Sequence, residues 1–338
     1  MKVWAKKGFN YIFLIILTII VLFFALKDDF NNIVNELLHI NVLWLFYAFL
    51  LMFGYWFFRS LVLKRYTSRF KKGARFLNSF QLTMRTQFFN AVTPFATGGQ
   101  PYQIYYLSKE DIKVSSSTSI IMQNFIVYQI ALVSLGVMAV ITNHFLHFYP
   151  KVALLGRLVT IGFIANTLVV IIMFLVAFNR KINEWLVKLG IWFLTKIHVV
   201  KDKAKKEKEW SDFANSFHDG AIQLLKNKGD FLYGIGMNFI ALISLYLIPL
   251  TILYATGGNE FSALEAVVTS AYVMLLGSFV PMPGGTGGLE YGFIAFYGNF
   301  LTGSQLTAIM LLWRFVTYYL GIILGAIALN VKRVKQWE

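Results

Sequence analysis

Two opposite charges, Glu290 and Arg314, stand in the last third of the chain among long runs of uncharged residues. A single charge inside hydrocarbon costs roughly 2.5–3.5 kcal/mol on insertion scales, so both side chains are expected to face the interior of a helix bundle and to contact each other. This pair has two alternative roles. As a structural pair, it would fix the glycine-rich segment before Glu290 to the last helix. As a binding pair, it would let Arg314 exchange its carboxylate partner for a phosphate through a bidentate hydrogen bond.

Prolines and glycines interrupt two stretches that are otherwise apolar enough for a membrane, residues 88–101 and 280–290. A continuous helix accepts them poorly, because proline removes hydrogen bonds and glycine is entropically costly. A half-helix that begins inside a membrane presents unsatisfied N–H groups and the positive end of its dipole, which suits a phosphate. The alternative is that these glycines only permit close helix packing. The candidate phosphate-binding positions are Gly98, Gly99, Gly284, Gly285, Gly287 and Gly288.

Further polar side chains lie around the first interruption, and some of them could reach the same ligand. Arg85 is expected to be a weaker counterpart of Arg314. The other arginines inside or near apolar runs, Arg59 and Arg157, are expected to extend to a membrane interface instead. The remaining candidates for this space are Gln87, Asn90 and Thr93 before the interruption, Gln100, Tyr102 and Gln103 after it, and Gln123, Asn124 and Tyr128 in the next run.

Composition places the whole chain in a membrane. It has 338 residues, 57% of them apolar and 14% charged, with a mean hydropathy of +0.62. A soluble domain carries roughly 25% charged residues, so soluble multidomain proteins are excluded. The net charge of +15 indicates membrane topology and anionic lipid heads, and no nucleic acid is expected as a partner. With no cysteine, five histidines and no nucleotide, metal or hydrolase motif, we expect no metal, no cofactor and no catalytic residue.

Uncharged runs recur along the chain, and about 20 residues suffice to cross the hydrocarbon. The sequence therefore predicts an all-α, polytopic integral membrane protein. Broken backbone is tolerated at membrane depth only where protein or a wet cavity satisfies it, so the two interruptions predict a cavity. The uncharged runs are residues 8–26, 41–63, 114–150, 158–179, 231–259, 266–289, 291–313 and 315–331.

The distribution of basic residues predicts how the interruptions are arranged. If each one forms a re-entrant hairpin from opposite faces, 26 of the 31 Lys and Arg fall on the cytoplasmic side, together with both termini. The hairpins then lie between spans of opposite sense, which is the layout of two inverted repeats. The predicted units are a first half over 1–178 with a hairpin at about 76–113, a basic cytoplasmic linker over 179–230 with an amphipathic helix, and a second half over 231–338 with a hairpin at about 264–303.

Three motifs resemble one known family. They are N-A-V-T-P-F-A-T-G-G-Q-P at 90–101, P-M-P-G-G-T-G-G-L-E at 281–290 and L-L-W-R-F at 311–315, and they are similar to the lysylphosphatidylglycerol synthase transmembrane family, or YbhN-type membrane proteins. In the multiple peptide resistance factors, a similar region is joined to a soluble aminoacyl-transferase domain and is regarded as the flippase for aminoacylated phosphatidylglycerol. The resemblance carries a site onto Pro283, Gly284, Gly285, Gly287, Glu290 and Arg314.

The chain ends at Glu338 soon after its last apolar run, which leaves no room for a transferase domain. Phosphatidylglycerol lysyltransferase activity by this chain alone is therefore not expected, despite the family's name. The resemblance implies a cell-membrane flippase for an anionic phospholipid, an aminoacylated phospholipid or a lipid-linked sugar phosphate. The alternatives are a non-transporting subunit that presents lipid to a separate synthase or transferase and, with least support, a membrane-embedded transferase. The expected partners are a phospholipid or glycolipid, a separate lipid-modifying enzyme and a second copy in a homodimer.

Overall fold

The computed structural model describes residues 30–148, 160–164, 167–168, 171–172, 174–175, 178–196, 202–258, 261–277, 282–301 and 303–331. Over this part of the chain the regular structure is entirely helical, which confirms the all-α prediction. The uncharged run at 8–26 lies outside the described residues. The elements at the periphery are α2 (Phe30–Leu38), α8 (Arg180–Lys196) and α9 (Lys203–Lys226).

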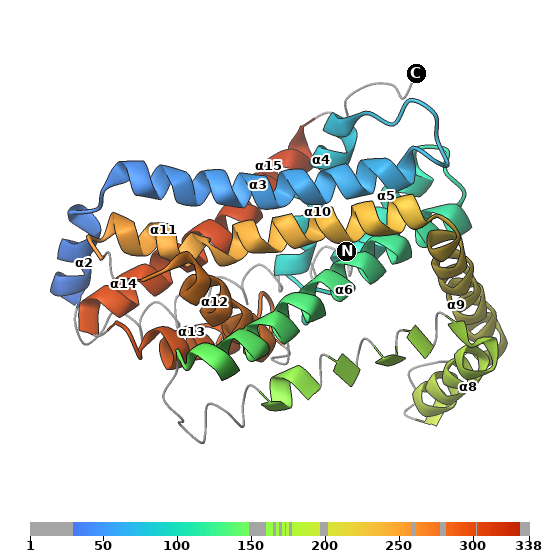
Figure 1. The fold of residues 1–338 in the computed structure, drawn as a ribbon. Coiled ribbons are helices and arrows are strands. Elements are labelled where there is room, and N and C mark those ends of the chain that lie inside the picture. Colours follow the sequence, from blue (N-terminus) through green and yellow to red (C-terminus); the bar gives the residue numbers. More distant parts are fainter. Residues whose placement is uncertain are drawn as a thin grey trace.

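Four long helical segments are apolar enough to cross a membrane and form most of the bundle (Figure 1). The predicted run at 114–150 contains one long helix. The predicted run at 291–313 is divided between a short helix and the beginning of the last long segment, which continues through the run at 315–331 with a π-helical turn in its middle. The four segments are α3 (Val42–Thr67), α6 (Val114–Leu146), α10 (Lys228–Tyr246) continued by α11 (Ile248–Ala255), and α14 (Gly303–Arg314) continued by η1 (Phe315–Tyr319) and α15 (Leu320–Asn330).

Helix α3 packs antiparallel to α10 and α11. At one end the Asn41 N–H donates to the Ala255 carbonyl at 2.8 Å. At the other end Arg65 Nε lies 2.9 Å from Asp230 Oδ1, and Arg69 pairs with the second oxygen of the same carboxylate. The Asp230 side chain is 4% exposed, so this cluster joins the end of α3 to the beginning of α10 in a largely buried position.

Two pairs of shorter helices fill the space between the long segments. Within each pair, one of the predicted breaks separates the two helices. With 10 to 16 residues, each helix is too short to cross a membrane alone. The helices of each pair pack against each other. The first pair is α4 (Phe76–Ala91) with α5 (Gly99–Ser108), and the second is α12 (Ala263–Gly277) with α13 (Gly288–Tyr297).

The two pairs open toward opposite ends of the bundle. Beside the first pair, Lys71 Nζ donates to the Glu110 carbonyl at 2.7 Å, so the chain enters α4 and leaves α5 at the same end. Beside the second pair, the rings of Phe261 and Phe300 lie 4.9 Å apart, so α12 begins and α13 finishes together. Tyr254 donates to the Phe261 carbonyl, which places this junction at the end where α11 finishes.

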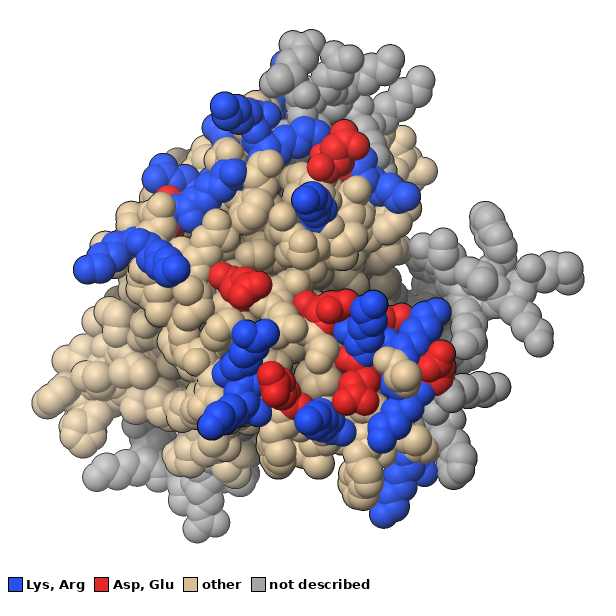
Figure 2. Space-filling view, turned by 90° about the vertical axis from the view of Figure 1, so that its right-hand side faces the viewer, with Lys and Arg blue, Asp and Glu red and all other residues tan. Residues whose placement is uncertain are grey.

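Charged side chains gather at the end of the molecule where α3 finishes and α8 and α9 lie (Figure 2). Helix α8 is held on α9 by the Asn183 amide, which donates to the Ala214 carbonyl at 2.8 Å. Helix α9 is held on α6, where Gln123 donates to Gln223 at 3.3 Å. The α8–α9 pair is therefore attached to the bundle through α6 at its charged end.

Candidate functional site

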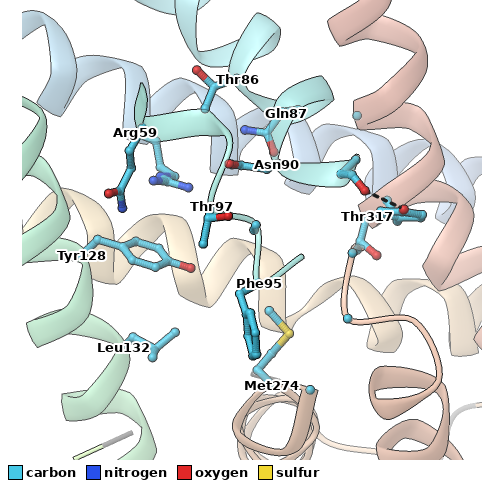
Figure 3. A pocket seen from close by; sticks show the side chains of 18 of the residues that line it. Arg59, Thr86, Gln87, Asn90, Phe95, Thr97, Tyr128, Leu132, Met274 and Thr317 are labelled. Carbon is cyan, nitrogen blue, oxygen red and sulfur yellow. Dashed lines mark hydrogen bonds between the residues drawn. The ribbon is translucent and has the colours of Figure 1, made fainter. Parts of the chain in front are cut away.

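A cavity of about 610 Å³ lies where the two breaks come together, between α3, α4, α5, α6, α12 and the η1–α15 segment. The sequence predicted a cavity at this place, because interrupted helices need a wet or protein-lined environment. Figure 3 shows Arg59 and Tyr128 on one side of this space, Thr317 on the other, and Asn90 and Phe95 between them.

The backbones of the two breaks touch at the wall of the cavity. Pro94 and Pro283 form an isolated antiparallel bridge, although they are 189 positions apart in the sequence. In the first break, Thr93 Oγ1 accepts the Gly98 N–H at 2.8 Å and donates to the Phe89 carbonyl at 2.7 Å. This hydroxyl satisfies the N–H group of the residue that immediately precedes α5, which the break would otherwise leave free.

Tyr318 of η1 connects the two breaks. Its hydroxyl donates to the Ala91 carbonyl at the end of α4, at 3.1 Å. Its ring lies against Gly284, where an added Cβ would be 2.0 Å from a ring carbon. Gly284 also has a φ of +64°, so both its conformation and its surroundings require glycine. Single π-helical turns are frequent at functional sites, and this one presents Thr317 and Tyr318 to the cavity.

Glu290 and Arg314 form the predicted ion pair, with 2.8 Å between Glu290 Oε1 and Arg314 Nε. Their side chains are 10% and 5% exposed. The second carboxylate oxygen accepts the Gly287 N–H at 2.7 Å, and the guanidinium donates to the Gly284 carbonyl and to Thr286 Oγ1 at 3.2 Å each. Neither residue is among the described residues that line the cavity, so the pair joins the second break to α14.

Arg85 has a comparable structural place. Its Nε donates to the Ala328 carbonyl and its Nη2 to the Val331 carbonyl, both at 2.9 Å. It is 4% exposed and lies outside the described lining of the cavity. A basic side chain at these positions satisfies carbonyls that the last turn of α15 leaves free, and it complements the helix dipole.

Arg59 lies at the position in the cavity that was predicted for Arg85 and Arg314. It was expected at a membrane interface, but the structure places it half-buried in the cavity wall. Its guanidinium carbon lies 4.4 Å from the centre of the Tyr128 ring and 5.5 Å from that of Tyr55, and Nη1 donates to the Tyr55 hydroxyl at 2.9 Å. Its Nε is buried without a hydrogen-bond partner in the described part of the chain.

The cavity wall carries a single charge among the residues that the structure describes, and that charge is Arg59. The described residues contain no group of three His, Cys, Asp or Glu that could hold a metal ion. The wall is rich in carboxamides and hydroxyls, which can donate and accept hydrogen bonds. The polar side chains lining it, besides Arg59, are Tyr55, Thr86, Gln87, Asn90, Thr97, Gln100, Gln103, Tyr128, Gln129, Thr317 and Tyr318.

The predicted site residues fall into two sets. One set lines the cavity, and the other lies outside its described lining, within the breaks or in the contacts that hold them. Tyr128 lines the cavity as expected, whereas Gln123 contacts Ser119 and Gln223 instead. The lining set is Asn90, Gln100, Gly284 and Gly285, and the other set is Arg85, Thr93, Gly98, Gly99, Pro283, Gly287, Gly288, Glu290 and Arg314.

Comparison with known proteins identifies the family. Residues 11–325 match the family described as the lysylphosphatidylglycerol synthase transmembrane region. The chain belongs to this family. A relative from Archaeoglobus fulgidus, named UPF0104 membrane protein, is 26% identical over 306 residues, which cover 87% of this chain and 88% of the relative. A second, from Mycoplasma genitalium and named Uncharacterized protein MG306, is 21% identical over 366 residues, covering 98% of this chain and 90% of the relative.

Membership in this family agrees with the four apolar helical segments, and together they describe a multi-pass membrane protein with a role related to membrane lipids. The three motifs that carried the resemblance have a common structural meaning. Two of them form the breaks at the cavity, and the third contains Arg314, which is bonded to the second break. The family motifs therefore build the junction around the cavity.

Proposed function

We propose that this protein binds the anionic head group of a membrane lipid in the cavity and moves that lipid between the two leaflets. The observation that carries the proposal is Arg59, a cation in the cavity wall with no carboxylate partner in the described chain. A cation that is partly withdrawn from water, with its Nε buried and unpaired, is stabilised when an anion accompanies it. A lipid phosphate supplies that anion and can accept from several guanidinium N–H groups at once.

The arrangement of the helices supports a transporter architecture. In this proposal each helix pair is a re-entrant hairpin, and the two halves of the chain are inverted repeats. The antiparallel course of α3 and α10, and the opening of the two pairs toward opposite ends, are what such repeats require. The charged end of the bundle is then cytoplasmic, because basic residues are retained on that side. In this proposal both termini are cytoplasmic, on the same side as the α8–α9 pair.

The chemistry assigned to each charged group follows from its contacts. Arg59 holds the lipid phosphate, and the acyl chains stay in the surrounding bilayer. The Glu290–Arg314 pair keeps the second break in shape, and Arg85 fixes the end of α15 on α4. The guanidinium groups of Arg85 and Arg314 are already bonded to carbonyls. We therefore assign to Arg59 the phosphate-binding role that was predicted for these two residues.

A leaflet-exchange assay tests the proposal. Purified protein is reconstituted in liposomes with phosphatidylglycerol that carries a fluorophore on one acyl chain, and reduction by external dithionite reports the label that reaches the outer leaflet. We expect Arg59→Gln to slow exchange by about tenfold or more, because a hydrogen-bonded charge contributes about 1.5–3 kcal/mol. Arg180→Gln is the matched control, since Arg180 is 69% exposed on α8. Exchange by Arg59→Gln at the parent rate would reject the proposal.

A second candidate function is a non-transporting subunit that presents lipid to a separate lipid-modifying enzyme. The observation that favours it is an aromatic face on α8 at the charged end, where Trp185, Trp192 and Phe193 are each more than half exposed. Exposed aromatic residues of this kind are frequent at interfaces with partners. Co-purification of a stoichiometric enzyme, together with exchange no faster than in empty liposomes, would favour this second function.

A further inference from the structure

The side chains of the cavity wall indicate which class of lipid head group the protein binds. The inference that follows rests on the proposed function. We propose that the cargo is a phosphodiester lipid whose head group is an uncharged polyol, such as glycerol, inositol or a sugar, and that the cavity selects against head groups with a free amine. The inference has two independent supports, the charge of the wall and the unpaired carboxamides in it.

The charge of the cavity wall can balance one negatively charged phosphodiester, and it disfavours a positively charged head group. Arg59 supplies one positive charge, and no Asp or Glu belongs to the lining that the structure describes. A primary amine in this space would meet a guanidinium without an accompanying carboxylate. The acidic side chain at the second break, Glu290, is already engaged by Arg314 and by the Gly287 N–H. A like charge placed beside an uncompensated cation is an effective element of selectivity.

Four carboxamides of the lining have no protein hydrogen-bond partner among the described residues: Asn90, Gln100, Gln103 and Gln129. They come from α4, α5 and α6, so they reach the space from three helices. A carboxamide both donates and accepts, and so does a hydroxyl group, whereas an ammonium only donates and a phosphodiester oxygen only accepts. Unpaired carboxamides in this number therefore match a ligand with several hydroxyl groups.

Arg59 is also held in a fixed direction, which separates the phosphate position from the polyol position. Tyr55 binds Nη1, and the Tyr128 ring covers one face of the guanidinium. Figure 3 shows Tyr128 beside Arg59 and Asn90 farther along the cavity. A phosphate bound to the guanidinium would thus leave its head group facing the carboxamides of α4 and α5.

Binding of four lipids to the purified full chain in nanodiscs tests the inference. The probes are phosphatidylglycerol, phosphatidic acid, lysyl-phosphatidylglycerol and monoglucosyl diacylglycerol, which vary the polyol, the amine and the phosphate separately. We expect phosphatidylglycerol to bind at least about tenfold more tightly than each of the others, because each of them lacks one matched group or adds a repelling one.

Two variants test the contribution of the carboxamides and that of the Arg59 charge separately. Gln100→Leu, on α5, should weaken phosphatidylglycerol severalfold and leave phosphatidic acid unchanged, while Gln305→Leu, on α14 outside the described lining, serves as the control. Arg59→Glu should reverse the order of phosphatidylglycerol and lysyl-phosphatidylglycerol. Equal or tighter binding of lysyl-phosphatidylglycerol by the parent protein would overturn the inference, and so would equal binding of phosphatidic acid.

The failure of this inference can be distinguished from failure of the proposed function. Selective binding of phosphatidylglycerol without any leaflet exchange would leave the head-group inference intact and reject transport. Exchange of all four lipids at the same rate, without preference in binding, would support transport and reject the inference.

Discussion

Neutralising both members of the Glu290–Arg314 pair should destabilise the protein by clearly less than the sum of the two single neutralisations. The variants are Glu290→Gln, Arg314→Gln and the double substitution. Each single change leaves one buried charge without its partner, which costs about 3–5 kcal/mol. The exposures of 10% and 5% leave little access for water to replace the lost partner. The double variant removes both charges, so its cost should fall at least about 2 kcal/mol below the sum of the two single variants.

The contacts around the pair refine this expectation. Glu290→Gln retains an oxygen that can accept the Gly287 N–H, whereas Arg314→Gln also loses the bonds to the Gly284 carbonyl and Thr286. Arg314→Gln should therefore be the more damaging single change, by about 1 kcal/mol.

Unfolding in mixed micelles with increasing SDS, followed by far-UV circular dichroism, gives the four free energies of this cycle. Arg180→Gln provides the control, because Arg180 and Glu184 lie 3.9 Å apart with exposures of 69% and 56%. An exposed pair of this kind contributes about 0.3–0.5 kcal/mol. Additive single effects, or single effects as small as that of Arg180→Gln, would contradict the assignment of Glu290 and Arg314 as a structural lock.

Two further substitutions test other contacts. Gly284→Ala should lower stability by about 1–3 kcal/mol, because its Cβ would overlap Tyr318 at a positive φ. Gly236→Ala is the control and should be nearly neutral, since no described atom, apart from its two chain neighbours and the backbone of its own helix, lies within 4 Å of the added Cβ. Thermal denaturation in detergent compares the two variants. Asp230→Asn should cost about 1–3 kcal/mol, because it leaves Arg65 at the end of α3 and Arg69 just beyond it without their carboxylate. Faster amide hydrogen exchange at the beginning of α10 would report the loosened junction, whereas unchanged exchange would contradict it.

The features that the sequence predicted well depend on local chemistry. Proline and glycine interrupt a helix wherever they occur, so the breaks after Ala91 and Gly277 follow from residue types alone. The pairing of Glu290 with Arg314 follows from the high cost of an isolated charge in an apolar run. In both cases the physical constraint acts within one segment or on a single pair of charges.

The features that were missed depend on contacts between distant segments. Arg59 precedes the basic residues at the end of α3, which resembles a side chain extending to an interface. Its place in the cavity depends on Tyr128, which is contributed by another helix 69 positions later. Arg85 contacts carbonyls 243 and 246 positions away, and its spacing within α4 gives no signal of them. Polar residue types marked the region correctly, but they did not reveal which arginine faces the cavity.

The contact between the two prolines has a mechanical consequence. The antiparallel bridge at Pro94 and Pro283 does not lengthen into a ladder, because both segments turn beside it: the Ala96 N–H donates to the Thr93 carbonyl, and the Gly285 N–H donates to the Met282 carbonyl. Beside it, the Tyr318 hydroxyl on the Ala91 carbonyl is a single neutral hydrogen bond with a net contribution of about 1 kcal/mol. Sliding of one break past the other would thus disturb only a small local contact, whereas moving the flanking helices apart would also break the packing of α3 on α10 and of α4 on α15.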